Sequence, residues 1–582
     1  MESKTPQFDK ALDAIFEGLA PHKRICKWTG EHKYCEGEFE ITKEDIEFLK
    51  MLRVPAPNYC PTCRRIRRFS HIINFRLFKI KCDVPNHSES MISIYGDECP
   101  FPVYDYKYFT GDEFDPFAYG VKYSRSTHII DDLLDLRKKF PMPSFLNRDP
   151  LSVNSDFSNS GRDLKNAYYT GSCYHSENIW YSVFLNKSNN IMDSNIVMDS
   201  EFVYSSFRSD HIYKSSYVYY SNNCLESMFL YDCRNCQNCF GCVNLRGAKY
   251  TVFNKQLTKK EYENFINSIY PLSRETVKEN EEKFWDLVKS LPINASRNVA
   301  SGDVSGVLIK NTHNAFDVTD SNQSENVRHS DGCIVHSNSM DVFYSGGGSS
   351  LLYSTVNIGS HSSGVKFSVS SKASTDSEFI FNCNNINNCF MCFGLRNKSY
   401  CVLNIQYSKD EYYKIVDEIK SDMINQGEYG DGFGIEFSAQ SYNFSAGQIT
   451  FPLSDEEIIK LGGYVSKEPE SNVGDIKIIS INDLPKTINE VTDNILNYAI
   501  KCEKSGRPFK IVESELQFYR EMKLPLPVRH PIFRIQEKTS INPIGKIYKA
   551  VCLKCSNSMN SVFGPKDGYV LYCEKCYNKE IY

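Results

Sequence analysis

The stretch Asn238-Cys-Phe-Gly-Cys-Val-Asn-Leu-Arg246 returns 150 residues later as Asn388-Cys-Phe-Met-Cys-Phe-Gly-Leu-Arg396. The match continues in the same register as far as Tyr262, whose counterpart is Tyr412. Similarity of this length at one fixed offset indicates an internal duplication, and we expect both copies to share one fold.

Shorter units lie upstream of each copy. In the first copy a polar residue is followed by an apolar one, two variable positions and a small residue, as in Asn178 to Ser182 and Asn190 to Ser194. Short β-rich units broken by Asn, Ser and Asp predict a β-solenoid, whose rungs stack small and apolar side chains inside. A meander or a sandwich with regular turns is the alternative. The second copy follows the pattern more loosely.

Each predicted solenoid copy is followed by a helix. Thr258-Lys-Lys-Glu261 and Ser408-Lys-Asp-Glu411 match the capping-box pattern, in which a Ser or Thr precedes a Glu by three residues. Apolar residues follow at helical spacing. A helix in this position would cover a sheet edge that could otherwise pair with another chain.

The C-terminus carries a strong metal-binding pattern. Two C-x2-C pairs, Cys552 with Cys555 and Cys573 with Cys576, are separated by 17 residues. This spacing is typical of a four-thiolate zinc ribbon, because two residues between thiols let each pair bind one ion from one turn. A pair of disulfides is the alternative. A closed four-cysteine site has no open position for catalysis.

The N-terminus contains a second candidate site, formed by Cys26, Cys35, Cys60 and Cys63. The pair Cys60-Pro-Thr-Cys63 before an arginine-rich segment is similar to the second knuckle of a treble clef opening a helix. The first pair is unusually wide, and His22 or His32 could replace one thiolate. With the ribbon, the sequence predicts two zinc ions per chain.

The two ends match each other at an offset of 470 residues. Phe39, Phe48 and the Pro55-x-Pro57 segment correspond to Phe509, Phe518 and the Pro525-x-Pro527 segment. Each end is therefore predicted to be one copy of a two-part module that has kept a different metal site. Single ligands remain in the other halves, and whether they bind metal is left open: Cys82, Cys99, Cys502 and His530.

A basic segment follows Cys63. Between residues 64 and 81 there are seven Lys or Arg residues and no acidic one. Arginines on a zinc-module helix predict a phosphate-binding surface, because the guanidinium fork matches phosphate oxygens. A solvated basic face or an intramolecular acidic partner is the alternative. The predicted nucleic-acid-binding residues are Arg64, Arg65, Arg67, Arg68, Arg76, Lys79 and Lys81.

Two further patterns invite a catalytic interpretation. The run Cys233, Cys236, Cys239 and Cys242 suggests an iron–sulfur cluster, but it lacks the final spacing and proline of the bacterial ferredoxin motif. We interpret it as a buried apolar row. Asp193, Asp199 and Asp210 lie where a solenoid could act on polysaccharides, but Asp also favours turns.

Composition narrows the class of protein. The 582 residues have a net charge of −5 and contain 22 cysteines. Several C-x2-C pairs favour metal binding in a reducing, cytoplasmic compartment over an oxidised scaffold. The first residues are charged, so no signal peptide is expected, and no apolar run approaches the length of a membrane helix.

The chain resembles an uncharacterised zinc-ribbon family of reduced-genome bacteria and large DNA viruses. The family has no established activity to carry over. The chain departs from it at the wide Cys26 to Cys35 spacing and at His530 and Phe533. The resemblance is carried by Cys60-Pro-x-Cys63-Arg64, Cys82-Asp83, Pro102-Val-Tyr104, Asp115-Pro116, Tyr119-Gly120 and Cys573-Glu-x-Cys576-Tyr577.

The expected fold class is α+β and multidomain, with a duplicated β-solenoid core, helical caps and a treble-clef or zinc-ribbon module at each end. The expected function is a non-enzymatic zinc scaffold that binds nucleic acid or a macromolecular assembly. A structural, virion-associated component is the first alternative, and a carbohydrate-active enzyme is the second. The predicted divisions are 1–110, 111–160, 161–255, 256–300, 301–405, 406–500 and 501–582.

Overall fold

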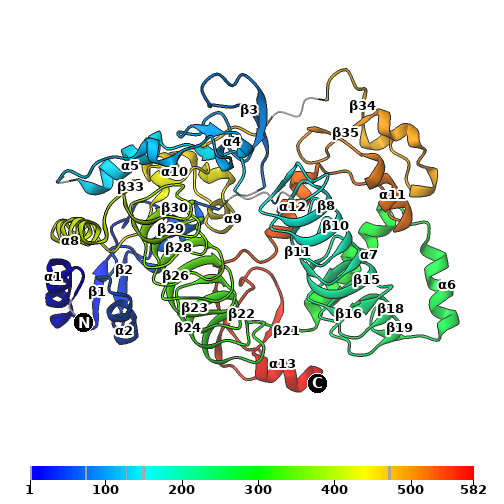
Figure 1. The fold of residues 1–582 in the computed structure, drawn as a ribbon. Helices are drawn as coiled ribbons and strands as arrows, with labels where there is room; N and C mark the ends of the chain where they lie inside the picture. The colour runs from blue at the N-terminus through cyan, green and yellow to red at the C-terminus, as the bar shows by residue number, and fades with distance from the viewer. Residues whose placement is uncertain (1–2, 73–74, 126–127, 147–148, 150, 470–472) are drawn as a thin grey trace.

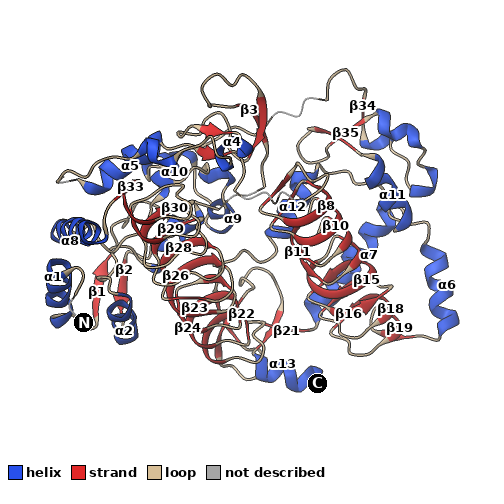
Figure 2. Cartoon of the chain, viewed as in Figure 1, coloured by secondary structure: helices blue, strands red, loops and turns tan. Residues whose placement is uncertain are grey.

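The computed structural model describes residues 3–72, 75–125, 128–146, 149, 151–469 and 473–582. It is a mixed α+β, multidomain chain with two parallel sheets side by side at its centre (Figure 1). Helices lie mainly around the outside of these sheets (Figure 2). Within the described residues, no helix combines the length and hydropathy that a membrane span requires.

The first parallel sheet contains residues 158–256. Its strands pair at a register of twelve residues, as Ile179 does with Ile191 and Ile191 with Val203. Each side-chain position is therefore repeated along the sheet, and like residues stack in rows. The strands are β7 (Ser158–Asn159), β8 (Arg162–Tyr168), β9 (Thr170–Gly171), β10 (Tyr174–Trp180), β11 (Val183–Asn186), β12 (Asn189–Met192), β13 (Asn195–Met198), β14 (Glu201–Tyr204), β15 (Phe207–Tyr219), β16 (Asn222–Leu225), β17 (Met228–Tyr231), β18 (Gln237–Val243), β19 (Lys249–Val252) and β20 (Lys255–Gln256).

The backbone of this sheet bends at nearly every third residue. Bend residues have a positive φ, as at Asn178 (53°) and Phe184 (56°), and the residue after each bend is buried, as at Ile179 and Leu185. Asn and Asp tolerate this left-handed conformation better than most residues, which explains the polar residues that recur in the sequence.

The same three-residue spacing explains the run from Cys233 to Cys242. Its four cysteines are at most 1 % exposed. Each thiol donates a hydrogen bond to the backbone carbonyl two residues before it. The interpretation of this run as a buried row is confirmed.

Serine hydroxyls inside the sheet connect successive strands. The Ser182 Oγ accepts a hydrogen bond from the Ser194 backbone N–H at 3.1 Å, and the Ser194 Oγ accepts one from Ser206 at 3.1 Å. On the outside, the Asn166 amide donates to the Asn178 amide oxygen. These rows supply partners for polar groups that the bends would otherwise leave buried and unpaired.

The second parallel sheet contains residues 302–406 and repeats this construction. Strands β18, β19 and β20 correspond at the offset of 150 residues to β31, β32 and β33. Its strands are β22 (Gly302–Lys310), β23 (His313–Asn322), β24 (Glu325–Arg328), β25 (Asp331–Cys333), β26 (His336–Ser345), β27 (Ser349–Ser350), β28 (Tyr353–Ile358), β29 (Lys366–Val369), β30 (Glu378–Phe381), β31 (Asn387–Phe390), β32 (Ser399–Val402) and β33 (Ile405–Gln406).

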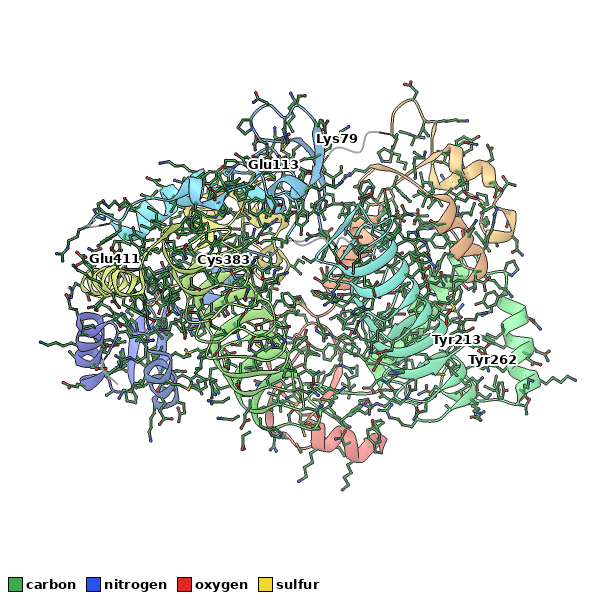
Figure 3. All side chains as sticks on the ribbon, in the orientation of Figure 1. Lys79, Glu113, Tyr213, Tyr262, Cys383 and Glu411 are labelled. Atoms are coloured by element: carbon green, nitrogen blue, oxygen red, sulfur yellow. The ribbon has the colours of Figure 1, made fainter. Side chains whose placement is uncertain are left out.

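Helices α6 (Lys259–Ile269) and α8 (Lys409–Gln426) follow the two sheets. Both predicted capping boxes are confirmed, with Thr258 and Ser408 accepting from the third helical N–H. Tyr262, labelled in Figure 3, is the buried residue of α6, whereas Cys383 lies within the second sheet.

The two sheets run in opposite directions and meet along their bends. The ring centroids of Phe184 and Tyr344 are 5.2 Å apart. Twenty-four residues later in the first sheet, Arg208 pairs at 2.9 Å with Asp320, which lies twenty-four residues earlier in the second. The contact therefore joins opposite ends of the two copies.

The end modules repeat each other as predicted. Helix α3 (Pro61–Phe69) and strand β3 (Phe78–Lys81) correspond at the offset of 470 residues to α12 (Pro531–Thr539) and β37 (Tyr548–Val551). Helix α2 (Lys43–Leu52) corresponds to α11 (Glu513–Glu521). The duplication of the ends is therefore visible in the elements as well as in the sequence.

The remaining elements belong to these modules and to the segments that join them. They are α1 (Pro6–Glu17), β1 (His22–Ile25), β2 (Glu38–Ile41), β4 (Ser90–Ser93), β5 (Val103–Tyr104), α4 (Tyr106–Thr110), α5 (Ile129–Lys139), β6 (Met142–Pro143), α7 (Arg274–Ser290), β21 (Pro292–Asn294), α9 (Ala446–Thr450), α10 (Asp455–Lys460), β34 (Ile478–Ile479), β35 (Ala499–Lys501), β36 (Pro508–Lys510), β38 (Ser558–Ser561), β39 (Val570–Tyr572) and α13 (Glu574–Ile581).

Candidate metal centres and interfaces

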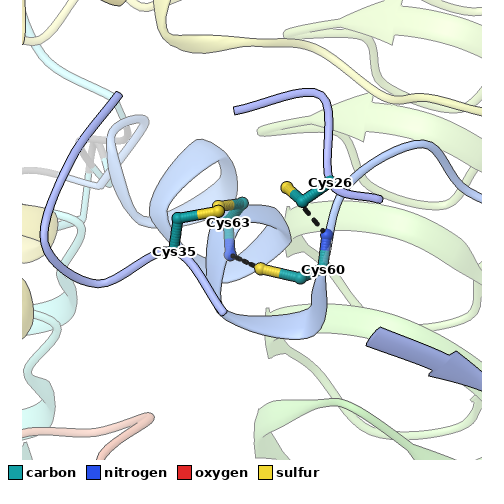
Figure 4. Close-up of side chains that lie close together, drawn as sticks. All are labelled: Cys26, Cys35, Cys60 and Cys63. Atoms are coloured by element: carbon teal, nitrogen blue, oxygen red, sulfur yellow. Dashed lines mark hydrogen bonds between the residues drawn. The ribbon is translucent and has the colours of Figure 1, made fainter. Parts of the chain in front are cut away.

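The N-terminal cysteines converge on one point. Cys26 follows β1, Cys35 precedes β2, Cys60 caps the N-terminus of α3, and Cys63 lies in its first turn. Their four Sγ atoms lie within 4.8 Å of one another (Figure 4). Four sulfurs at that separation match the donor set of a tetrahedral zinc site.

Backbone N–H groups stabilise these thiolates. The Cys60 N–H donates to the Cys26 Sγ at 3.3 Å, and the Cys63 N–H donates to the Cys60 Sγ at 3.4 Å. Hydrogen bonds from Cys60 and Cys63 lower the pKa of Cys26. Metal sites use such outer hydrogen bonds to orient their ligands.

Neither histidine joins this four-sulfur set. The His32 Nε2 lies 3.3 Å from the Cys63 Sγ, as an outer partner, and His22 contacts the Ala20 carbonyl on the surface. The all-cysteine arrangement is the one that the structure brings together.

The C-terminal cysteines form a second group, with their Sγ atoms also within 4.8 Å of one another. Cys552 and Cys555 lie between β37 and β38, whereas Cys573 caps α13. Although burial opposes it, N–H donors from Cys573 and Cys555 lower the pKa of Cys552 to about 6. Cys555 is exposed, so this group is more open than the N-terminal one.

Both groups place their second cysteine pair at the start of a helix. Cys60 precedes α3 and Cys573 precedes α13. A helix N-terminus favours negative charge, which suits a thiolate-rich site. The predicted ribbon therefore ends in a helix.

The other half of each module retains isolated ligands. The His530 N–H donates to the Cys502 Sγ at 3.2 Å, as Cys60 does to Cys26. In the N-terminal copy, the Cys82 Sγ lies 3.9 Å from the His87 Nδ1. No further cysteine-containing cluster of three ligands occurs within the described part of the chain.

The arginines of α3 point into the protein. Arg65 pairs at 3.0 Å with both Asp317 and Asp331 of the second sheet, and Arg68 donates to Asp341 at 2.8 Å. Burial opposes the charge of Arg65, but the two carboxylates raise its pKa. The network continues to Arg64, which lies 2.8 Å from Asp341.

This network corrects the prediction of a phosphate-binding face on α3. Arg64, Arg65, Arg67 and Arg68 are at most 8 % exposed. Arg67 instead lies over the ring of Tyr59, 4.3 Å from its centroid. Because carboxylates and aromatic rings already surround these guanidinium groups, they are not available to nucleic acid in this fold.

The remaining predicted basic residues divide into two groups. Arg76 is 3 % exposed and donates two hydrogen bonds to the Glu468 carboxylate. Lys79, labelled in Figure 3, and Lys81 are exposed on β3. Only these two lysines of the predicted set remain open to solvent.

The C-terminal module repeats the arginine contact on the other sheet. Arg534, the counterpart of Arg64, forms an ion pair with Asp193 of the first sheet. Each module therefore packs its second helix against one of the parallel sheets through buried arginine and aspartate.

This contact also removes one of the carboxylates considered for catalysis. Asp193 is 2 % exposed and bound to Arg534. Asp199, Asp210 and His211 do gather on the first sheet, with His211 2.8 Å from Asp210. Exposed acidic groups of this kind are common without a ligand.

A cavity of about 1540 Å³ lies between the two parallel sheets. Its lining comes from both sheets and from C-terminal residues that include Asn542 and Tyr582. The sequence analysis missed it, because its residues are twelve positions apart and form no contiguous motif. The twelve-residue register is the signal that would have grouped them.

Comparisons with known proteins add little. No family model matches the sequence, and no curated protein does. One solved structure, described as an acetyltransferase from Desulfovibrio desulfuricans G20, is 10 % identical and covers 41 % of this chain. The match spans 64 % of that protein, which is less than two thirds, and its TM-score of 0.10 carries no argument.

Proposed function

We propose that this chain is a non-enzymatic scaffold that is stabilised by two zinc ions and binds a macromolecular partner. The observation that carries the proposal is the pair of four-cysteine groups, one in each end module, with each module packed on a parallel sheet. Zinc at these positions would hold the modules folded, and the modules would hold the sheets.

The two parallel sheets are best understood as β-solenoids. The constant twelve-residue register, the bends at about every third residue and the interior rows of Ser, Cys and aliphatic residues support this description. Stacked repeats of this kind expose long, regular surfaces, which proteins commonly use for binding.

Zinc is the metal that the donor set favours. Four thiolates in a closed site suit zinc, and such a site holds structure without an open position for a substrate. The N–H groups that donate to Cys26 and Cys60 favour the charged thiolate form that zinc requires.

Nucleic acid is the leading partner and a protein assembly, such as a virion, is the second candidate. The first is favoured by exposed cations along the cavity between the sheets. The second is favoured by exposed apolar residues on the second sheet, namely Ile334 (52 % exposed), Val335 (41 %) and Leu351 (37 %). The resemblance to a family of bacteria and large DNA viruses is compatible with either.

Two measurements test the proposal. Elemental analysis of the purified chain should find about two zinc ions per molecule, and chelation should lower its thermal stability. The native protein, isolated from its source, should copurify with nucleic acid if that is the partner, or with a defined protein assembly if the second candidate holds. Metal-free protein of unchanged stability would refute the zinc scaffold.

A further inference from the structure

We infer that the cavity between the two parallel sheets binds single-stranded nucleic acid. This inference rests on the proposed function, since it assigns a site to the nucleic-acid binding proposed above. The site replaces the basic face of α3, whose arginines are buried. Four basic residues, here called the groove cations, carry the argument: Arg162, Lys187, Arg234 and Lys310.

The groove cations provide uncompensated positive charge. All four line the cavity and are exposed. None has a carboxylate partner among the described residues, whereas Arg208 and Arg297, which also line the cavity, pair with Asp320 and Asp232. A cavity with excess positive charge attracts a polyanion.

The groove cations are spread along the cavity. The parallel register stacks Arg162 and Arg234 in one column of the first sheet, six strand steps apart. At about 4.8 Å per step, they are separated by roughly 29 Å. The second sheet begins beside Arg234, because Arg297 pairs with Asp232, and this contact brings Lys310 to the same end. Such a length suits an extended chain of several nucleotides.

Aromatic rings lie beside these cations. Tyr174 is 41 % exposed and stacks in the same column, directly next to Arg162. At the other end Tyr582 is 66 % exposed, and the Arg234 guanidinium lies 5.5 Å from its ring centroid. Alternation of cations and aromatic faces is how proteins hold single strands, with bases stacked on the rings.

The cavity also contains buried acceptors without donors. The amide oxygens of Asn195, Asn322 and Asn542 have no hydrogen-bond partner in the protein, and all three residues line the cavity. Buried acceptors normally have partners. The amino groups of nucleobases would supply donors, which a polyanion without bases would not.

The strandedness follows from what the cavity offers. Its volume of about 1540 Å³ exceeds the usual size of a small-molecule pocket, about 300 to 1,000 Å³. A duplex keeps its bases stacked inside and cannot present their faces to Tyr174 and Tyr582. A single strand presents both phosphates and base faces, so it satisfies the cations and the rings together.

The test uses the full-length protein and fluorescent oligonucleotides of random sequence, single-stranded and duplex, over a salt series, with heparin as a competitor. In the groove variant all four groove cations become Glu. A matched control variant carries the same change at four exposed lysines of α6, α7 and α8, which are Lys260, Lys278, Lys289 and Lys414. Circular dichroism and zinc content confirm that both variants fold.

We expect the wild type to bind single strands at low salt and the groove variant to bind at least about tenfold more weakly. The slope of log affinity against log salt should fall by about 3, because each lost phosphate contact removes about 0.7 from a single-strand slope. The control variant should change affinity less than about threefold. Tyr174→Ala should weaken binding without changing the salt slope.

Three outcomes would overturn the inference. Equal affinities of the two variants would place nucleic acid elsewhere and leave the proposed function standing. Tighter binding of duplex or heparin would exclude a single-strand site. A wild type that binds no oligonucleotide would refute nucleic acid as the partner altogether, and with it this site, without affecting the zinc scaffold.

Discussion

Glu515, Arg534 and Asp193 lie together where the C-terminal module packs on the first sheet. All three are buried, and Glu515 is 0 % exposed. Burial raises the pKa of Glu515 to about 7, although Arg534 acts against this. The Glu515 carboxyl also accepts the Val512 N–H at 2.9 Å, so it caps α11 as well as carrying charge.

The substitution Glu515→Gln should therefore make stability less dependent on pH. Below about pH 4.5 the carboxyl is protonated in the folded and the unfolded state, so it has no effect. As pH rises from about 4.5 to 7, the unfolded state ionises first and wild-type stability falls, by up to about 3 kcal/mol. Gln keeps the cap without this loss.

Denaturant unfolding at pH 4.5 and pH 8 measures the difference. The variant should match the wild type at pH 4.5 and exceed it by about 1–3 kcal/mol at pH 8. A variant that is less stable by the same amount at both values would show that the carboxyl is ionised throughout.

Asp331 has the opposite role at the other module. It is 0 % exposed and pairs with Arg65, while the Thr319 hydroxyl donates to it at 2.7 Å. The change Asp331→Asn leaves Arg65 buried beside a neutral group, and breaking a buried ion pair from one side costs about 3–5 kcal/mol.

Chemical denaturation at neutral pH should show this loss for Asp331→Asn and almost none for the exposed control Asp303→Asn. The pair Arg65→Met with Asp331→Leu should recover much of the stability, because it removes both charges together. Equal stability of Asp331→Asn and wild type would mean that the ion pair does not hold α3 on the second sheet.

At the scale of elements, the sequence identifies what is local. The capping boxes at Thr258 and Ser408 and the two sets of cysteine pairs depend on neighbours within a turn, so spacing alone predicts them. The three-residue bend is harder to recognise. Its interior row mixes Ser182, Cys233 and Ile179, so no regular apolar period marks the strands.

The two metal modules should also differ in how much they stabilise the chain. Each of the changes Cys63→Ser and Cys576→Ser removes one ligand and should lower zinc content from about two ions to about one. Cys63 is 0 % exposed and lies in α3, which carries the buried arginines, whereas Cys576 is partly exposed.

Zinc analysis and thermal unfolding distinguish the two variants. We expect Cys63→Ser to lower the melting temperature more than Cys576→Ser. Full zinc occupancy in either variant would exclude its cysteine as a ligand, and equal melting temperatures would mean that α3 does not depend on its metal.

At the scale of the whole molecule, the end modules cross over. The N-terminal module packs on the second sheet through Arg65, and the C-terminal module packs on the first through Arg534. The partners Arg65 and Asp331 are 266 residues apart in the sequence. Such pairing cannot be inferred from local patterns, which is why α3 was expected to present its arginines to solvent.

The two modules also touch each other. A Cβ added to Gly545 would lie 2.5 Å from the Phe69 ring, and Lys546 lies 5.2 Å from the ring centroid of Tyr34. The contact between the ends that the duplication suggested is therefore present. It links both metal modules and both sheets into one arrangement.

This arrangement predicts the order in which the molecule loosens when metal is removed. The C-terminal group includes the exposed Cys555, whereas Cys60 and Cys63 are 0 % exposed, so a mild chelator should remove the C-terminal ion first. Strand β39 pairs with β21, which joins the two copies. Hydrogen exchange should therefore rise first in β37, β38, β39 and β21.

Mass spectrometry of hydrogen exchange during chelation checks this order. Helix α3 and the second sheet should keep their protection until the N-terminal ion leaves, because buried ion pairs still hold them together. The variant Cys576→Ser, without chelator, should reproduce the first stage alone. Loss of protection in α3 at the same time as in β39, or before it, would contradict both the order of release and the independent stability of the N-terminal contact.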